Sequence, residues 1–276
     1  MITEVARAKL NLALHIRARR PDGYHELETL FAFVADGDRL TLSAAEADSF
    51  EIVGPFAVAL AGESDNLVLR ALGAFRRRYG VDAPLAIRLD KRLPVASGIG
   101  GGSADAAAAL RALARHFDRA FDTPDMLQCG LELGSDVPAC LLSRTVRGSG
   151  RGETLVPLDG PAGMPVLLVH PGTALSTAAV FAGWRGIDHG PLPDGSVLEV
   201  AQRGRNDLQP PAQTLAPVIG ECLDLMQRQD GAVLTRMSGS GATCFSLYET
   251  AAARNTAAAA IAAARPDWWL LETELV

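Results

Sequence analysis

The sequence contains very little lysine. Of its 26 basic residues only Lys9 and Lys91 are lysines, and all the others are arginines. A GC-rich genome would explain the excess of arginine. Under the same bias, however, a retained lysine is a candidate for a position that needs a compact ammonium group and cannot accept a guanidinium. We therefore expect at least one of the two lysines to be catalytic.

Long apolar segments and metal-binding cysteine patterns are also missing. The longer apolar runs, such as 165–169, are far too short to cross a membrane. The N-terminus lacks the basic-then-apolar order of a signal peptide, so we expect a cytoplasmic protein with no membrane partner. The four cysteines form no Cys-x-x-Cys pair, which argues against a zinc site and predicts buried, reduced thiols.

The charge balance also lacks a basic excess. A net charge of −6 and a pI near 5.4 argue against a nucleic-acid partner, because such proteins usually carry a basic face. A small nucleotide is not excluded, since backbone amides and one or two cations can hold its phosphates. The 276 residues suffice for one large core or two modest ones. The sequence leaves the oligomeric state open.

The most informative segment is the glycine-rich stretch at 98–102. It precedes an alanine-rich helical run, and glycine allows a ligand to approach the backbone closely. The first N–H groups of a helix have no partner within it and lie at the positive end of its dipole. The segment therefore predicts a phosphate site, although a turn without a ligand is the alternative. It lacks the Gly-Lys-Ser/Thr of a P-loop, and Ser103 stands where the dinucleotide fingerprint needs glycine.

Alternation and capping signals predict the helices and strands. Residues 3–16 alternate as a strand, with Lys9 and Asn11 on one face. A Ser64-Asp65 capping signal precedes a predicted helix over 66–79, and Thr123-Pro124 opens another over 124–133. The other predicted helices span 103–117, 176–184, 213–228 and 250–264, with a short helix after 134–138 and a loop over 185–196. The other predicted strands span 39–45, 50–54, 85–90, two within 144–158, 166–169, 232–237, 243–248 and 269–275. This order predicts an antiparallel sheet with helices on one face in the last third.

Four segments together carry a resemblance to a known family. They are Ala8-Lys9-Leu10-Asn11-Leu12, the glycine-rich loop with its Pro-x-x-x-Gly-Ile-Gly-Gly-Gly-Ser form, Gly134-Ser135-Asp136-Val137-Pro138 and Gly239-Ser240-Gly241-Ala242-Thr243. Each is weak alone, but in this order and at these separations they resemble the GHMP kinases. The resemblance implies an α+β fold of two lobes. The first lobe would be ribosomal-protein-like and the second ferredoxin-like, and the Gly/Pro-rich segment 159–165 suggests a division into 1–158 and 159–276.

The resemblance also implies the roles of individual residues. Lys9 would stabilise the transferred phosphoryl group, and Asp136 would accept the proton of the acceptor hydroxyl. The alternative for Asp136 is a helix N-cap, which Asp followed by Val-Pro fits well. ATP with Mg²⁺ would be the phosphoryl donor, and Ser103 is a candidate metal ligand. The residues expected to bind ATP are Asn66, Lys91, Pro94, Val95, Ala96, Ser97, Gly98, Ile99, Gly100, Gly101, Gly102, Ser103 and Ala104.

Within the family, the segment 20–31 resembles the branch that acts on a methylerythritol joined to cytidine diphosphate. Tyr24 and Phe181 would stack on the two faces of the cytosine, with His25 offering a hydrogen bond. The residues expected to bind this substrate are Asn11, Tyr24, His25, Thr177, Phe181, Gly239, Ser240 and Gly241. The segment Asn206-Asp207-Leu208 matches as well, with no role that we can assign. A kinase for a non-nucleotide alcohol and a non-catalytic ligand-binding protein on the same fold are the alternatives.

One departure from the family pattern concerns the residues after Ser103. The branch usually continues Ser-Ser-Asn, whereas this chain continues Ser103-Ala104-Asp105. A carboxylate therefore replaces an amide near the expected phosphates. Asp105 would either help to hold Mg²⁺ or favour the positive end of the helix. The metal ligands are not settled by the sequence.

Overall fold

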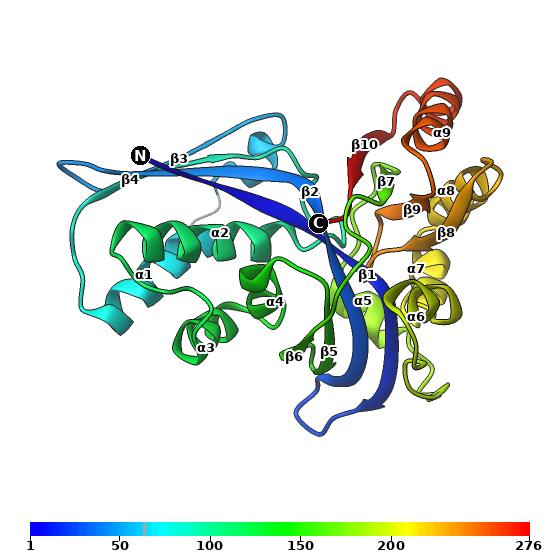
Figure 1. Ribbon diagram of the computed structural model, residues 1–276, viewed down its shortest axis with the longest axis horizontal. Coiled ribbons are helices and arrows are strands. Elements are labelled where there is room, and N and C mark those ends of the chain that lie inside the picture. Colours follow the sequence, from blue (N-terminus) through cyan, green and yellow to red (C-terminus); the bar gives the residue numbers. More distant parts are fainter. Residues whose placement is uncertain (63–64) are drawn as a thin grey trace. The chain divides into compact units, whose positions relative to one another are not determined.

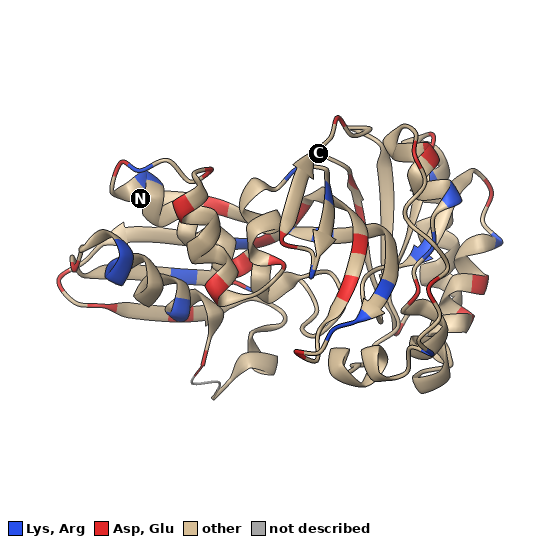
Figure 2. Ribbon diagram, turned by 90° about the horizontal axis from the view of Figure 1, so that it is seen from below, with Lys and Arg blue, Asp and Glu red and all other residues tan. Residues whose placement is uncertain are grey.

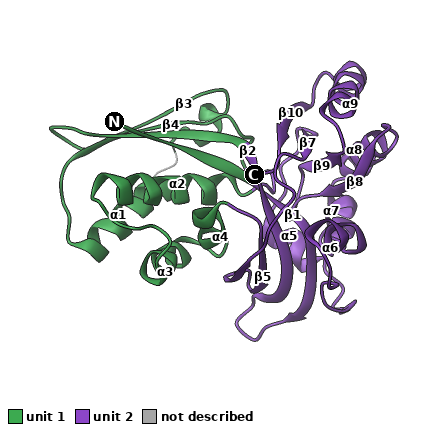
Figure 3. Ribbon diagram, viewed as in Figure 1, with its two compact units in different colours: residues 1–8, 36–95, 100–143 green, residues 9–35, 96–99, 144–276 purple. Residues whose placement is uncertain are grey.

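The computed structural model describes residues 1–62 and 65–276. The chain folds into two compact units that are interleaved along the sequence (Figure 3). Unit 1 comprises residues 1–8, 36–95 and 100–143, and unit 2 comprises residues 9–35, 96–99 and 144–276. The sequence predicts a division of the chain into two lobes at residue 158. The two compact units follow a different division, and the lobe boundary at residue 158 stays a prediction.

Unit 1 is a sheet with helices on one side (Figure 1). Strand β4 (Leu85–Asp90) pairs in parallel with β3 (Ser49–Val53) and antiparallel with the last part of β2 (His25–Ala44). Strand β1 (Ile2–Arg19) in turn pairs with β2. The helices are α1 (Leu67–Tyr79), α2 (Gly101–His116), α3 (Pro124–Leu133) and α4 (Val137–Leu142), with a 3-10 turn η1 (Ala57–Leu60).

Helix α2 is the central helix of unit 1. Every residue from Ala104 to Ala114 is buried, which is the pattern of a helix surrounded by protein on all sides. Helices α1, α3 and α4 all contact it. Its alanine-rich sequence follows from this position, because small side chains let the neighbouring helices approach closely.

Unit 2 contains a second, four-stranded sheet in the order β10-β7-β9-β8, antiparallel throughout. Its strands are β7 (Pro165–His170), β8 (Ala232–Met237), β9 (Cys244–Tyr248) and β10 (Trp269–Glu274). Helices α8 (Val218–Gln227) and α9 (Ala251–Ala264) contact this sheet (Figure 1). Because helices follow the first and third of these strands, this is the ferredoxin-like pattern, and the predicted antiparallel sheet is confirmed. The remaining elements are β5 (Val146–Gly150), β6 (Thr154–Pro157), α5 (Thr177–Ala182), α6 (Val197–Arg203) and α7 (Gln209–Leu215).

Several predicted boundaries were wrong. The cap of α1 is Asn66, whose side chain accepts a hydrogen bond from Val68 N, and Ser64 lies outside the described residues. The single helix predicted over 213–228 is two helices, α7 and α8, because Pro217 removes a backbone donor at their junction. Helix α6 was missed, although its capping box of Ser196 and Glu199 is a readable signal. Strand β2 begins at His25 rather than at residue 39.

The four cysteines are buried and free, as predicted.

Burial of His170 in unit 2 predicts a loss of stability in acid. The side chain is 6% exposed, and burial lowers its pKa to about 4. The unfolded chain therefore binds a proton first, near pH 6.5, and the free energy of unfolding falls as the pH drops from 6.5 towards 4. We expect His170 to account for about 2 kcal/mol of the loss between pH 6.5 and 5.

Urea denaturation at these two pH values, in the native protein and in His170→Gln, measures this contribution. The variant should lose less stability on acidification than the native protein. Equal losses in the two proteins would show that other groups dominate acid unfolding.

Candidate active site

Three segments that are distant in the sequence meet in unit 2. Asn11 N donates a hydrogen bond to Ser238 Oγ over 3.2 Å, and Ser238 Oγ donates to Gly98 O over 3.1 Å. Lys9 N donates to Ile99 O over 2.9 Å. The first strand, the glycine-rich loop and the C-terminal glycine turn are thus joined by direct hydrogen bonds. These are three of the four segments that the sequence singled out.

The contact between the loop and the turn requires glycine. Gly98 has a φ of +80°, and a Cβ atom there would lie 2.5 Å from Gly241 O and 2.6 Å from Ser238 O. Gly239 has a φ of +53°, and a Cβ atom there would lie 2.8 Å from Gly98 O. No side chain fits at those distances, so the two backbones approach each other only because both residues are glycines.

We expect Gly98→Ala to destabilise the protein and to weaken ATP binding at least tenfold. The added methyl group meets backbone oxygens that cannot move aside, and the left-handed conformation alone costs about 1–2 kcal/mol. Gly163→Ala is a matched control, since Gly163 has a φ of +76° with nothing within 4 Å of its Cβ position. Thermal melts and ATP titrations of both variants make the comparison. Similar melting and unchanged ATP affinity in the two variants would contradict the close packing seen at Gly98.

Lys9 presents a buried ammonium group beside this contact. Its side chain is 4% exposed, and Nζ donates a hydrogen bond of 2.8 Å to Asn11 Oδ1. Asn11 Nδ2 in turn donates to Thr29 Oγ1 over 2.8 Å, which fixes the orientation of the amide. The Lys9 ammonium also lies 5.1 Å from the centre of the Phe31 ring. The positive charge is therefore held in one place rather than on a mobile surface side chain.

Asn206 supports the C-terminal glycine turn. Its Nδ2 donates to Met237 O and to Gly239 O, both over 2.8 Å, and its Oδ1 accepts from Leu208 N. This gives the Asn206-Asp207-Leu208 segment the role that sequence reasoning could not assign. Asp207 connects the same segment to β1, because its Oδ2 accepts a hydrogen bond from Ile16 N over 2.7 Å.

In unit 1, the remaining glycines form the beginning of α2. Gly100 is the N-cap residue with a φ of +67°, and Gly101 and Gly102 are already helical, two residues before the predicted start. Because the N-cap residue is a glycine, it has no side chain that could accept from the first N–H groups of α2. The helix therefore begins as a set of backbone donors at the positive end of its dipole, as a phosphate site requires.

A buried ion cluster lies beside the first turn of α2. Lys91 Nζ lies 2.6 Å from Asp38 Oδ2 and 2.6 Å from Asp105 Oδ2, and all three side chains are almost completely buried. Burial acts to lower the pKa of Lys91, but the carboxylates of Asp105 and Asp38 raise it overall, so the ammonium stays charged. Burial raises the pKa of Asp105 to about 7, against the effect of Lys91. A Cβ atom on Gly101 would lie 3.1 Å from Lys91 Nζ, so the ammonium packs directly against the beginning of the helix.

Asp136 occupies the N-cap position of α4 but does not act as a cap. Its φ and ψ are −85° and −16°, and its side chain makes no capping hydrogen bond. A capping residue normally takes extended backbone angles and accepts from the second or third helical N–H. The capping alternative is therefore not supported by the geometry.

The residues expected to bind a pyrimidine lie in unit 2. His25 stacks on Phe181 with ring centres 4.9 Å apart and planes inclined by 34°. Tyr24 is 51% exposed, and the Arg151 guanidinium lies 4.8 Å from the centre of its ring. Thr177 Oγ1 lies 3.0 Å from Ser240 Oγ, which connects α5 to the C-terminal glycine turn.

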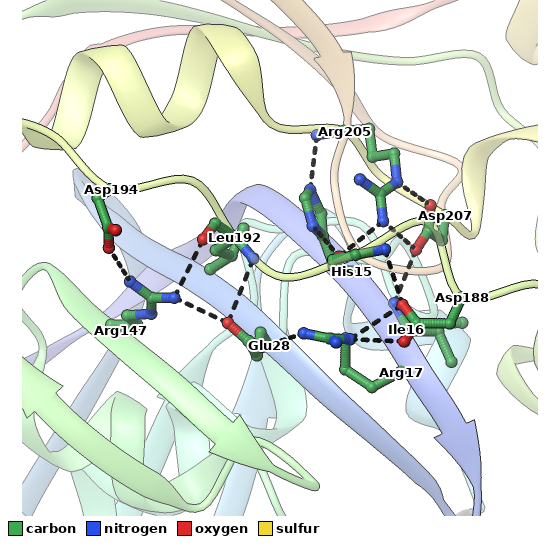
Figure 4. Close-up of polar contacts among 11 residues, drawn as sticks. His15, Ile16, Arg17, Glu28, Arg147, Asp188, Leu192, Asp194, Arg205 and Asp207 are labelled. Atoms are coloured by element: carbon green, nitrogen blue, oxygen red, sulfur yellow. Dashed lines mark hydrogen bonds and ion pairs between the residues drawn. The ribbon is translucent and has the colours of Figure 1, made fainter.

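The loop that follows α5 is held by a polar network (Figure 4). Arg17 Nε donates to Asp188 Oδ1 over 2.9 Å, and Glu28 Oε2 accepts from Leu192 N over 3.2 Å. His15 Nε2 accepts from Arg205 N over 3.1 Å, so its Nδ1 carries the proton donated to Gly190 O. The predicted loop over 185–196 is therefore irregular in backbone but fixed at several points to β1 and β2.

Comparison with known proteins gives consistent matches along the chain. Residues 66–144 match the family described as GHMP kinases N terminal domain, and residues 195–267 match GHMP kinases C terminal. The chain is 54% identical to a 4-diphosphocytidyl-2-C-methyl-D-erythritol kinase of Rhizorhabdus wittichii, covering 99% of this chain and 94% of that protein. A protein of the same name from Sphingopyxis alaskensis is 50% identical, covering 97% and 96%.

The chain belongs to the GHMP kinase family.

Solved structures agree with this assignment. A crystal structure of 4-(cytidine 5'-diphospho)-2C-methyl-D-erythritol kinase is 34% identical, with a TM-score of 0.84 and coverage of 99% of both chains. A homoserine kinase of Cytophaga hutchinsonii has a TM-score of 0.70 at 17% identity, covering 98% of this chain and 95% of that chain, and shows the shared fold alone. The predicted α+β, two-domain GHMP fold is confirmed.

Sequence reasoning missed Asp38, which accepts hydrogen bonds from Lys91 Nζ and from the backbone N–H groups of Arg92 and Leu93, and no local pattern marks its position. It singled out the segment of Asn206 but assigned it no role. Trp184 packs edge-on against His25, with ring centres 5.6 Å apart.

Within the described ranges, no group of three or more His, Cys, Asp or Glu side chains is arranged to hold a metal ion. No helix in residues 1–62 or 65–276 is long and apolar enough to span a membrane.

Proposed function

We propose that this chain transfers the γ-phosphoryl group of ATP to the 2-hydroxyl of 4-diphosphocytidyl-2-C-methyl-D-erythritol, a step of non-mevalonate isoprenoid precursor synthesis. The observation that carries the proposal is the 54% identity to a kinase of that name along nearly the whole length of both proteins. The Lys9–Asn11 pair and the packed glycine segments supply the chemical groups that such a transfer needs.

Backbone amides of the segment 98–102 and of the first turn of α2 are proposed to bind the ATP phosphates. Gly100 begins α2 with a φ of +67°, a conformation that favours glycine, and as a glycine it brings no side chain to the first N–H groups of the helix. Mg²⁺ prefers oxygen ligands such as hydroxyl and carboxylate groups. Proteins usually bind it through a small number of side chains together with the phosphate oxygens of the substrate. Ser103, in the first turn of α2, is the proposed protein ligand, and Mg²⁺ would neutralise charge on the phosphates.

Lys9 and Asp136 are proposed as the catalytic residues. Phosphoryl transfer depends mainly on positioning and charge stabilisation, and the fixed ammonium of Lys9 suits the charge that develops on the transferred group. Asp136 would accept the proton of the 2-hydroxyl. A carboxylate is only a mild base, which suits a loose transition state in which the alcohol loses its proton late.

The cytidine end of the substrate is proposed to contact Tyr24, His25 and Phe181. The exposed Tyr24 ring offers a stacking surface, and base–aromatic stacking contributes about 1–3 kcal/mol per base. Asn11, Thr177 and the turn Gly239-Ser240-Gly241 are proposed to bind the rest of the molecule.

The remaining proposals concern location and partners. We propose a cytoplasmic enzyme whose partners are small molecules. Acidic and basic residues are interspersed along the ribbon rather than gathered on one element (Figure 2), which together with the net charge of −6 suits a protein without a nucleic-acid partner.

A coupled assay of ADP release across a panel of alcohols tests the proposed function. The panel contains the cytidine diphosphate conjugate of methylerythritol, free methylerythritol, mevalonate and homoserine. We expect turnover with the conjugate only. Turnover with a non-nucleotide alcohol alone would favour another GHMP activity, and no turnover with any member would favour a ligand-binding role.

A further inference from the structure

Trp184 is an aromatic residue that the proposed function has not used. It follows α5 in the sequence and lies edge-on to the His25 imidazole, with the two ring planes inclined by 84°. The same imidazole packs against the Phe181 ring, with ring centres 4.9 Å apart and planes inclined by 34°. His25 is therefore in contact with two rings, and an edge-to-face arrangement such as that with Trp184 is a favourable geometry for aromatic pairs.

Both supporting rings are themselves fixed. Phe181 and Trp184 pack against the hydrophobic core of unit 2, which includes Val180, Leu208 and Ala212. A tight turn joins them, because Trp184 N donates to Phe181 O over 3.1 Å. Glycine at position 183 lets this turn pack closely against α7, since a Cβ atom there would lie 2.8 Å from Pro211 Cβ.

The charge state of His25 follows from the same surroundings. Burial, and then the nearby Arg19, lower its pKa below the ordinary value. The imidazole is therefore neutral at pH 7 and offers one N–H donor and one lone pair. A neutral, oriented ring can discriminate between hydrogen-bonding edges, whereas a freely rotating or charged ring discriminates less well.

We infer that Trp184 is a positioning residue for recognition of the pyrimidine, acting by holding the His25 imidazole in its orientation against Phe181. The inference rests on the proposed function, because it assigns the cytidine end of the substrate to His25. Trp184 itself need not touch the substrate. Its effect should fall on the binding of the cytidine substrate and not on ATP or on the chemical step.

The test compares Trp184→Ala, Trp184→Phe and Ile187→Ala with the native protein. Trp184→Ala should raise the KM for the cytidine diphosphate conjugate about 2- to 12-fold, the change that corresponds to one aromatic pair. The kcat and the KM for ATP should stay within twofold. Trp184→Phe keeps an edge-on ring and should restore most of the loss. Ile187→Ala, at a 53%-exposed residue of the same loop, should change nothing.

Two further measurements separate positioning from general structure. In NMR titrations of the free protein, the pKa of His25 should rise towards its ordinary value in Trp184→Ala, because the ring loses burial. The double variant Trp184→Ala/His25→Ala should lose no more affinity than His25→Ala alone.

Equal increases in both KM values, additive losses in the double variant, or an unchanged His25 titration would each overturn the inference. The titration needs no substrate. A failure of the proposed function, seen as no turnover of the conjugate by the native protein, is therefore distinguishable from a failure of Trp184 to hold His25.

Discussion

Replacing Asp136 with asparagine should lower the rate of phosphoryl transfer by about 10²- to 10⁴-fold, the usual range for loss of a general base. Asparagine has nearly the size of aspartate but cannot accept the proton of the acceptor hydroxyl. Because the Asp136 side chain makes no capping hydrogen bond to α4, the substitution removes no helix cap. Single-turnover phosphoryl transfer with saturating ATP is the measurement.

A control variant separates this effect from a simple change of charge. Asp82→Asn makes the same chemical change at a fully exposed position of unit 1, and it should leave both the transfer rate and the melting temperature unchanged. Asp136→Asn retaining more than about a third of the native rate would remove Asp136 as the base. Lys9 would then have to account for catalysis.

Replacing Lys9 with methionine should lower turnover by about 10²- to 10³-fold, as expected for losing a preorganised charge at the reacting group. Methionine keeps most of the side-chain volume and removes the ammonium. The change also leaves Asn11 Oδ1 without its donor, which should cost about 1–3 kcal/mol of stability. Turnover and the urea midpoint should therefore both be measured, at substrate concentrations well above both KM values.

Lys9→Arg is the informative companion variant. It keeps the charge but brings a larger, planar group into a position that is 4% exposed, and we expect it to restore little activity. If Lys9 and Asp136 act on the same transfer step, the double variant Lys9→Met/Asp136→Asn should lose much less than the product of the single losses. Full activity in Lys9→Arg would contradict the argument that a compact ammonium is needed there.

Local signals in the sequence predicted most of the elements. Thr123 caps α3 through a short-range hydrogen bond and Pro124 opens it, as predicted, whereas the cap of α1 is Asn66 and not the predicted Ser64-Asp65 signal. The beginning of α2 was readable as well, because the glycine cluster stands directly before an alanine-rich run, and the helix begins two residues before the predicted start. These features depend on residues within a few positions of each other, so one sequence contains the information.

The supporting residues could not be predicted in this way. Asn206 binds carbonyl groups 31 and 33 positions further along the chain, and Asp38 binds a lysine 53 positions away. Neither partner is marked by spacing or periodicity. The stacking of His25 on Phe181 likewise depends on where the tertiary fold carries α5, and an alternating pattern in a strand gives no information about that contact.

The scarcity of lysine has a practical consequence for work with this protein. Both lysines are buried, Lys9 at 4% and Lys91 at 2% exposure. Amine-directed reagents should therefore find neither lysine side chain accessible in the folded state. Enzymes that acetylate or ubiquitinate surface lysines have no such side chain to act on in the native state, and lysine labelling would become a direct readout of unfolding.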